Sequence, residues 1–237
     1  MVGREVFMPV SFSPMLENTR PRRRYDAPQR REQAERTRST VVEAAGRVFV
    51  ERGYAGATMV QIAAEAGVAV ETVYRSADGK ASLLEAAVQA ALAGGAERAE
   101  TRTDDRPGIR RVIEENDPRR QLWLYAATQP GVWSRAGDLL RVLDAAAGSE
   151  PQLAALRLAH DRQRHDGMRR FARLLGERGA LRDGMSVERA ADILWTVCAQ
   201  ANYDSLVRAR GWSEDDYRTW LADTLTAALL GPSISPA

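Results

Sequence analysis

A single lysine and a run of arginines are the residues of this 237-residue chain that point most clearly to a chemistry. Residues 20–38 contain eight arginines and three acidic residues, although the formal net charge of the chain is only +2. Clustered cations bind phosphate groups, so this stretch is a candidate phosphate-binding footprint; a solvated basic tail explains it equally well. Lys80 is the only lysine, which makes its position in the fold worth following.

The histidines and the cysteine have no spacing that indicates a metal site. The chain contains His160, His165 and a single cysteine, Cys198. One cysteine excludes an intrachain disulfide and a cysteine-based metal cluster, and two histidines without further ligands do not make a zinc site. We therefore expect no metal and no cofactor. Cys198 lies in an apolar stretch, which favours packing over redox sensing.

Motifs of the common enzyme classes are missing from the sequence. It contains no glycine-rich phosphate loop, no G-x-S-x-G elbow and no H-E-x-x-H pair. We expect a protein that is not an enzyme. A helical enzyme, or a helical interaction protein that does not bind DNA, is kept as the alternative.

The composition favours helices over sheets. Hydrophobic residues make up 44% and charged residues 28%, and the chain has 39 alanines but only five isoleucines. No apolar run approaches the length of about 18 residues that a membrane helix needs, and the N-terminus has no signal-peptide core. The sequence predicts an all-α, cytoplasmic protein without a membrane partner.

The N-terminal third has the local signals of two short helices joined by a turn. Helical periodicity begins near Gln29 and ends at Gly53, where a glycine cap is expected. Thr58, followed by a glutamine three residues later, fits a capping box that opens the next helix. Gly67 breaks this helix, and residues 68–75 are long enough for another. Two short helices around a glycine turn are a helix-turn-helix candidate.

The rest of the chain is predicted to be helical as well. A longer helix is expected to run from Lys80 to about Glu100. Prolines and glycines, Pro130 among them, divide the remaining residues into separate segments. These predicted helices span residues 107–115, 118–128, 131–147, 151–177, 186–209 and 213–230. Residues 1–28 lack periodicity and are expected to be a disordered basic arm.

Residues 38–84 combine these signals in an order and spacing that are specific as a set. The pieces are Ala44-Ala45, Phe49, Gly53-Tyr54, Thr58, Ile62-Ala63, Ala66-Gly67-Val68, Thr72-Val73-Tyr74, Lys80 and Leu83-Leu84. With them, a fifth of the chain resembles the DNA-binding domain of the tetracycline-repressor (TetR) family of bacterial transcription regulators. Two positions depart from the family: Ala69 stands where a capping serine is frequent, and Ala77 where an aromatic residue is common.

The resemblance implies the organisation and the partners of the whole chain. It implies a helix-turn-helix domain over residues 29–80, and a helical ligand-binding and dimerisation domain over residues 81–237. It further implies a DNA-binding transcriptional regulator, a repressor that a small-molecule ligand releases from double-stranded DNA. As a homodimer, such a protein reads an inverted-repeat operator.

Seven residues are the candidates for contacts with DNA. The resemblance implies backbone contacts for Thr58, Tyr74 and Lys80, and positions near the bases for Val70, Glu71 and Thr72. Arg75 reaches outward from the same short helix. Three alternatives stay open: Thr58 only caps its helix, Tyr74 packs against the first helix, or Glu71 is a helix-start charge favoured by the dipole.

An interrupted apolar stripe on residues 151–177 suggests a ligand site. Two polar residues interrupt it, and a buried polar group needs a partner. A partly polar cavity with aromatic walls would provide one, for which Tyr125 and Trp133 are further wall candidates. The ligand-binding candidates are Trp123, His160, Arg164, Met168 and Trp195. In the alternative, His160 and Arg164 pair with acidic side chains or reach solvent.

The last two predicted helices suggest how the chain dimerises. Residues 186–209 are apolar nearly all round, so a helix there must be buried on more than one side. Together with residues 213–230 they could face their own core and pair with a twin in a two-fold four-helix interface. A monomer core is the alternative.

Overall fold

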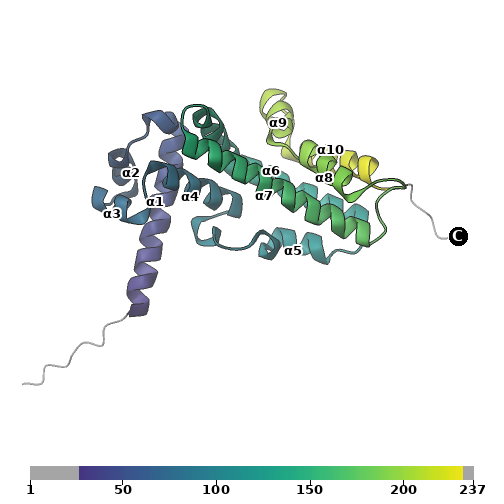
Figure 1. Cartoon of the computed structure of the whole chain (residues 1–237), viewed down its shortest axis with the longest axis horizontal. Coiled ribbons are helices and arrows are strands. Elements are labelled where there is room, and N and C mark those ends of the chain that lie inside the picture. The colour runs from purple at the N-terminus through teal and green to yellow at the C-terminus, as the bar shows by residue number, and fades with distance from the viewer. Residues whose placement is uncertain (1–26, 232–237) are drawn as a thin grey trace, which may run out of the picture.

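The predicted all-α fold is confirmed. The structure is a computed structural model that describes residues 27–231, and this part of the chain holds ten α-helices and no β-strand (Figure 1). The predicted basic arm, residues 1–28, lies outside the described residues except for its last two, which begin the first helix.

Four helices form the N-terminal part of the molecule. They are α1 (Ala27–Gly56), α2 (Met59–Ala66), α3 (Val70–Ser76) and α4 (Lys80–Ala93). The N-terminal half of α1 projects away from the other helices, and its side chains up to Thr40 are largely exposed (Figure 1). From Val41 onward, α1 packs its apolar stripe on α2, α3 and α4. Gly53, the predicted end of the first helix, has a φ of 67° and interrupts α1 there.

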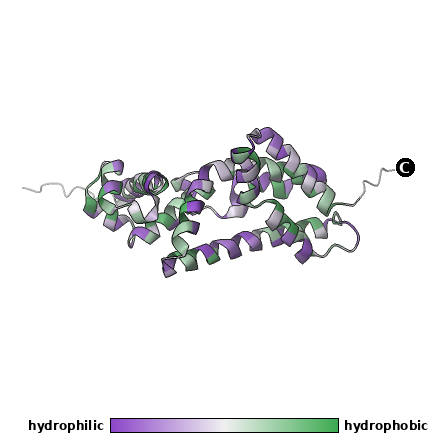
Figure 2. Cartoon of the chain, turned by 90° about the horizontal axis from the view of Figure 1, so that it is seen from above, coloured by the Kyte–Doolittle hydropathy of each residue, from purple (hydrophilic) through white to green (hydrophobic). Residues whose placement is uncertain are grey.

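Six helices form the larger part of the described chain. They are α5 (Pro107–Glu114), α6 (Pro118–Ala147), α7 (Pro151–Glu177), α8 (Val187–Val197), α9 (Gln200–Tyr203) and α10 (Glu214–Leu229). Short 3-10 turns at Ala96–Arg98 and Thr103–Asp105 join α4 to α5. The helices α6 and α7 run side by side, and α8 packs on α7 while α10 packs on α6 (Figure 1). Hydrophilic residues dominate the outward sides of the helices, with hydrophobic residues between them (Figure 2).

One hydrophobic core connects the two parts. Both α1 and α4 contact α6, and the buried cluster extends from Val41 to Leu229 without a break. The helix α4 is therefore held between the helix-turn-helix and the larger helical part.

The prediction of separate helices over residues 118–128 and 131–147 is wrong. Pro130 lies inside the continuous helix α6 and is itself buried. Proline has no N–H to donate to the carbonyl of Ala126, which costs about 3 kcal/mol in a helix interior. The helix nevertheless continues, because α1, α4, α5, α7 and α10 all pack on it and burial outweighs one lost hydrogen bond.

The prediction of a single helix over residues 186–209 is also wrong. The helix α8 ends at Val197, and Ala199 is extended, with a ψ of 145°. The side-chain amide of Asn202 donates to the carbonyls of Thr196 and Val197, at 3.0 and 2.9 Å. It thereby satisfies carbonyl groups that a helix leaves without partners at its C-terminus. The chain resumes in α9 and then a π-helical segment, Asp204–Ala209.

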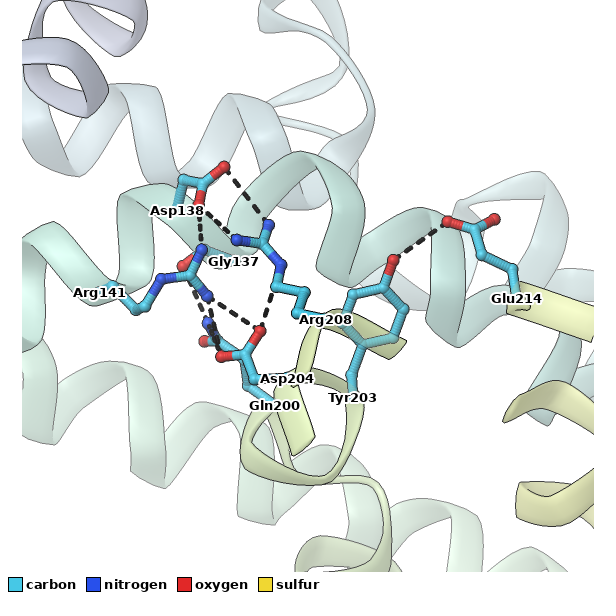
Figure 3. Close-up of polar contacts among 8 residues, drawn as sticks. All are labelled: Gly137, Asp138, Arg141, Gln200, Tyr203, Asp204, Arg208 and Glu214. Carbon is cyan, nitrogen blue, oxygen red and sulfur yellow. Dashed lines mark hydrogen bonds and ion pairs between the residues drawn. The ribbon is translucent and has the colours of Figure 1, made fainter. Parts of the chain in front are cut away.

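A network of side chains attaches α9 and this segment to α6 (Figure 3). Arg141 of α6 donates to both carboxylate oxygens of Asp204, at 3.0 and 2.8 Å, and also pairs with Asp138. Arg208 joins the network through Asp138 at 2.8 Å. The amide of Gln200 donates to the carbonyl of Gly137 at 2.9 Å. The packing of the π-helical segment is therefore fixed by charged groups as well as by apolar ones.

The predicted helix from Lys80 to about Glu100 is shorter than expected. It ends at Ala93, where Gly94 adopts a left-handed conformation with a φ of 85°. The N–H of Gly94 caps the carbonyls of Ala90 and Ala91, and Gly95 also has a positive φ. Two consecutive glycines with a positive φ end the helix, since other residues adopt a positive φ only with strain.

Candidate nucleic-acid interface and ligand cavity

The helices α2 and α3 form the two halves of a helix-turn-helix. The hydroxyl of Thr58 accepts a hydrogen bond from the N–H of Gln61 at 3.2 Å, and the Gln61 side chain accepts one from the N–H of Thr58 at 2.9 Å. The predicted capping box is therefore present. Gly67 then turns the chain with a φ of 66°. This turn sets the angle between α2 and α3.

One face of α3 is buried and the opposite face is exposed. Val73 is fully buried on the face of α3 that packs on α1 and α2. Glu71, Tyr74 and Arg75 are exposed, and Tyr74 is 59% exposed, so its ring does not pack away against α1. A short helix that is anchored on one side and free on the other has the shape of an element that enters the DNA major groove.

The remaining predicted residues of α3 are only partly accessible. Val70 is half-buried and packs against the core, while the hydroxyl of Thr72 accepts a hydrogen bond from Arg75 at 3.1 Å. Ala69 precedes the helix without any side-chain cap. Since Arg75 is tied to Thr72 within the helix, these two side chains form one polar patch beside Tyr74.

Lys80 makes contacts that the sequence did not indicate. Its Nζ donates to the carbonyls of Tyr54 and Ala57, at 2.8 and 3.2 Å, and lies 4.3 Å from the centroid of the Tyr54 ring. The only lysine thus ties the start of α4 to the end of α1. A contact from Lys80 to a DNA phosphate stays a prediction, and it would have to use the remaining N–H.

A comparison with family models identifies this part of the chain. Residues 41–87 match the model described as "Bacterial regulatory proteins, tetR family". The helix-turn-helix part of the chain is therefore similar to the N-terminal domain of this family. The match covers the buried half of α1, all of α2 and α3, and the first turns of α4. No curated protein sequence matches the chain.

Solved structures show that the TetR-like fold extends over nearly the whole described chain. A Mesorhizobium loti protein assigned to this family shares 20% identity, with a TM-score of 0.65, over 82% of this chain and 96% of its own. FadR from Bacillus subtilis, in complex with stearoyl-CoA, shares 16% identity, with a TM-score of 0.63, over 79% and 97%. NalD, the secondary repressor of the MexAB-OprM efflux pump in Pseudomonas aeruginosa, shares 20%, with a TM-score of 0.60, over 83% and 98%.

A cavity of about 830 Å³ lies in the larger half of this TetR-like fold. It is lined by residues of α4, α5, α6, α7 and the segment that joins α4 to α5. Tyr125, Trp133, Met168 and Phe171 supply apolar wall, and the rings of Tyr125 and Phe171 are 4.9 Å apart. The volume suits a molecule of drug or metabolite size.

The cavity includes three of the five predicted ligand-binding residues, His160, Arg164 and Met168. Trp123 and Trp195 do not line it, and their expected place in its wall is wrong. Trp123 is 44% exposed and faces Arg218 of α10. It lies two residues from Tyr125, which is about 200° around the same helix and therefore on the opposite side. Trp195 instead contacts Arg164, through its backbone carbonyl and its ring.

Arg164 is a partly buried cation at this cavity. Its Nη2 donates to the carbonyl of Trp195, and its guanidinium lies 5.1 Å from the Trp195 ring and 6.0 Å from the Trp133 ring. Its Nε is buried without a hydrogen-bond partner. Burial lowers the pKa of Arg164, and burial also lowers the pKa of His160, which favours a neutral imidazole near pH 7.

Two further features bear on the class of protein. Among residues 27–231, no group of three or more histidine, cysteine, aspartate or glutamate residues is placed to hold a metal ion. No helix in the same range is both long and apolar enough to cross a membrane.

Sequence reasoning missed several arginines that line the cavity, of which Arg106 and Arg135 are the clearest. Arg106 lies in the turn before α5, where no periodicity shows which way a side chain points. Arg135 is exposed on α6 and reads as a solvated surface charge. An excess of basic residues between 98 and 173 was the signal that could have found them.

Proposed function

We propose that this protein is a transcriptional repressor that binds an inverted-repeat operator as a homodimer and that a small molecule releases from DNA. The family match favours a regulator over a helical enzyme or an interaction protein. The observation that carries the proposal is the recognition helix α3, with Val73 buried and Tyr74 exposed on the opposite face. Such a repressor acts in the cytoplasm, where its operator is.

In this proposal the domain boundary lies at the start of α4. Residues 29–80 bind DNA and residues 81–237 bind the ligand and the second subunit. Thr58, Tyr74 and Lys80 contact the phosphate backbone, whereas Val70, Glu71, Thr72 and Arg75 lie along the bases. The exposed face of α3 and the exposed position of Thr58 at the N-terminus of α2 support these roles.

The cavity is the proposed ligand site. His160, Arg164 and Met168 line it, and it also touches the last turn of α4, which starts beside the recognition helix. FadR, which shares the fold, has been determined with stearoyl-CoA. A ligand lowers DNA affinity only if it prefers a conformation in which the two recognition helices are wrongly spaced. Displacement of α4 would produce such a conformation.

A gel-shift titration on the DNA that flanks this protein's own gene tests the proposal. The matched variants are Arg75→Gln on α3 and Arg162→Gln on α7, since both replace one exposed arginine. Loss of a base or phosphate contact costs about 1–3 kcal/mol, so Arg75→Gln is expected to weaken binding by roughly tenfold or more. Arg162→Gln should bind like the wild type.

Footprinting and salt titration complete this test. We expect protection of two half-sites about one helical turn apart, and affinity that falls steeply as salt rises because counterions are released. Equal affinities of the two variants, or no specific binding at any salt concentration, would contradict the proposed function.

A further inference from the structure

Three arginines from separate segments surround the C-terminal end of α4. This arginine cluster consists of Arg98, Arg106 and Arg135, and all three line the cavity. Arg106 Nη1 donates to the carbonyl of Leu92 at 3.0 Å, and Arg135 Nε donates to the carbonyl of Ala91 at 3.3 Å. Guanidinium nitrogens of Arg98 and Arg135 each lie 3.8 Å from the place that a Cβ atom on Gly94 would take.

The positive charge of the cluster exceeds what the helix end can balance. A helix C-terminus is equivalent to about half a negative charge, whereas the cluster brings three guanidinium groups together. Arg98 pairs with Glu97 at 3.7 Å, but Arg106 and Arg135 form no ion pair with any carboxylate of the described residues. The nearby charge of Arg135 adds to burial in lowering the pKa of Arg106, and the Nε of Arg106 is buried without a partner.

The same imbalance holds for the cavity as a whole. Among residues 27–231, its lining includes seven arginines and two carboxylates, those of Asp104 and Glu177. Asp104 already pairs with Arg170 at 3.5 Å. The aromatic side chains Tyr125 and Trp133 provide an apolar wall within the same cavity. A ligand that complements this site has an apolar body and a negative charge.

We infer that the ligand of this cavity is an amphipathic anion whose oxyanion group is bound by the arginine cluster at the end of α4. Guanidinium groups bind carboxylates, sulfonates and phosphates through paired charge-assisted hydrogen bonds, which are stronger than their bonds to neutral carbonyls. The anion therefore draws Arg106 and Arg135 away from the last carbonyls of α4. The inference rests on the proposed function, since it names the ligand class of the same cavity.

Two fluorescent probes that differ in their charge test this inference. 8-Anilinonaphthalene-1-sulfonate carries a sulfonate, and N-phenyl-1-naphthylamine has the same ring system without it. Arg135→Gln is the main variant because Arg135 is exposed and its loss leaves no cavity in the core. Arg162→Gln is the control, since Arg162 is an exposed arginine outside the cavity lining.

We expect the sulfonate to bind the wild type with one molecule per chain. Arg135→Gln should lower its affinity about tenfold or more, as the loss of a charged hydrogen bond does, while the neutral probe binds within twofold of the wild type. Arg162→Gln should change neither affinity. Arg106→Gln is the second variant and should act in the same direction as Arg135→Gln.

Competition against the bound sulfonate identifies the anionic group. Decanoate and decyl phosphate present a carboxylate and a phosphate on the same chain, and decanol is their neutral match. Either anion should displace the probe at concentrations at which decanol does not. The stronger competitor identifies the anionic group that the site prefers.

Three results would overturn the inference. Arg135→Gln and Arg106→Gln could leave the affinity for the sulfonate unchanged, or they could lower the affinities for both probes equally. In either case a ligand cavity, and thus the proposed function, would stand without an anion site. If neither probe binds the wild type, the proposed ligand cavity fails as well, whereas operator binding in the gel shift is measured independently.

Discussion

At the scale of single residues, the environment of the Cys198 thiol predicts how slowly it reacts. Its side chain is fully buried, and burial raises the pKa of the thiol to about 12. Only about one molecule in ten thousand is then a thiolate at pH 8, and the thiolate is the reactive form. We expect 5,5′-dithiobis(2-nitrobenzoic acid) to leave the native protein unmodified for many minutes. In urea it should release one equivalent of chromophore per chain. Rapid reaction of the native protein would contradict this packing role.

The residues of the candidate sites were predictable to different degrees. The exposed positions of Thr58 and Tyr74 could be predicted because local signals, a capping box and a helical face, decide where their side chains go. Trp123 was misplaced because an aromatic residue on a buried helix can face either side, and only its neighbours decide which. Arg106 was missed because its role depends on α4, which is distant in sequence and brought close only by the fold.

At the scale of elements, the predictions held where a boundary has a local cause. The turn between α2 and α3 is set by Gly67, and the sequence alone identifies it. The continuity of α6 through Pro130 and the break before Ala199 depend on packing and on the Asn202 side chain. Those causes lie in tertiary contacts, which hydrophobic periodicity does not report.

The network that holds the π-helical segment on α6 gives a prediction at this scale. Asp204→Asn removes the charge that pairs with Arg141 and Arg208. The pairs are partly exposed, so we expect a loss of about 1 kcal/mol, or roughly 2–4 °C in the thermal unfolding midpoint. Asp192→Asn is the control, since that side chain is 71% exposed and, among the described residues, its one ion pair is with His165. Scanning calorimetry of both variants decides: equal midpoints would show that the network adds no stability.

At the scale of the whole molecule, the proposed function requires two chains. A repressor of this size reads both half-sites of an inverted repeat only if a dimer fixes the spacing of its two α3 helices. The helices α8 and α10 are the proposed interface. These helices lie at the end of the molecule away from α3 (Figure 1). They carry partly buried apolar side chains, among them Ile193 and Trp220. A two-fold interface there would complete the burial of both.

Trp220→Arg tests this arrangement. Trp220 lies on α10 with its ring 5.7 Å from that of Tyr217, and a charge there is expected to prevent a second α10 from packing. Sedimentation velocity at micromolar concentration should show a monomer, and operator binding in a gel shift should be lost. Circular dichroism should still show the helical content of the wild type.

The control, Trp212→Arg, changes an exposed tryptophan that precedes α10 and should leave a dimer that binds DNA. The interface is placed wrongly if Trp220→Arg still sediments as a dimer. A wild-type protein that sediments as a monomer would instead remove the basis for a two-fold operator, because one α3 helix can read only one half-site.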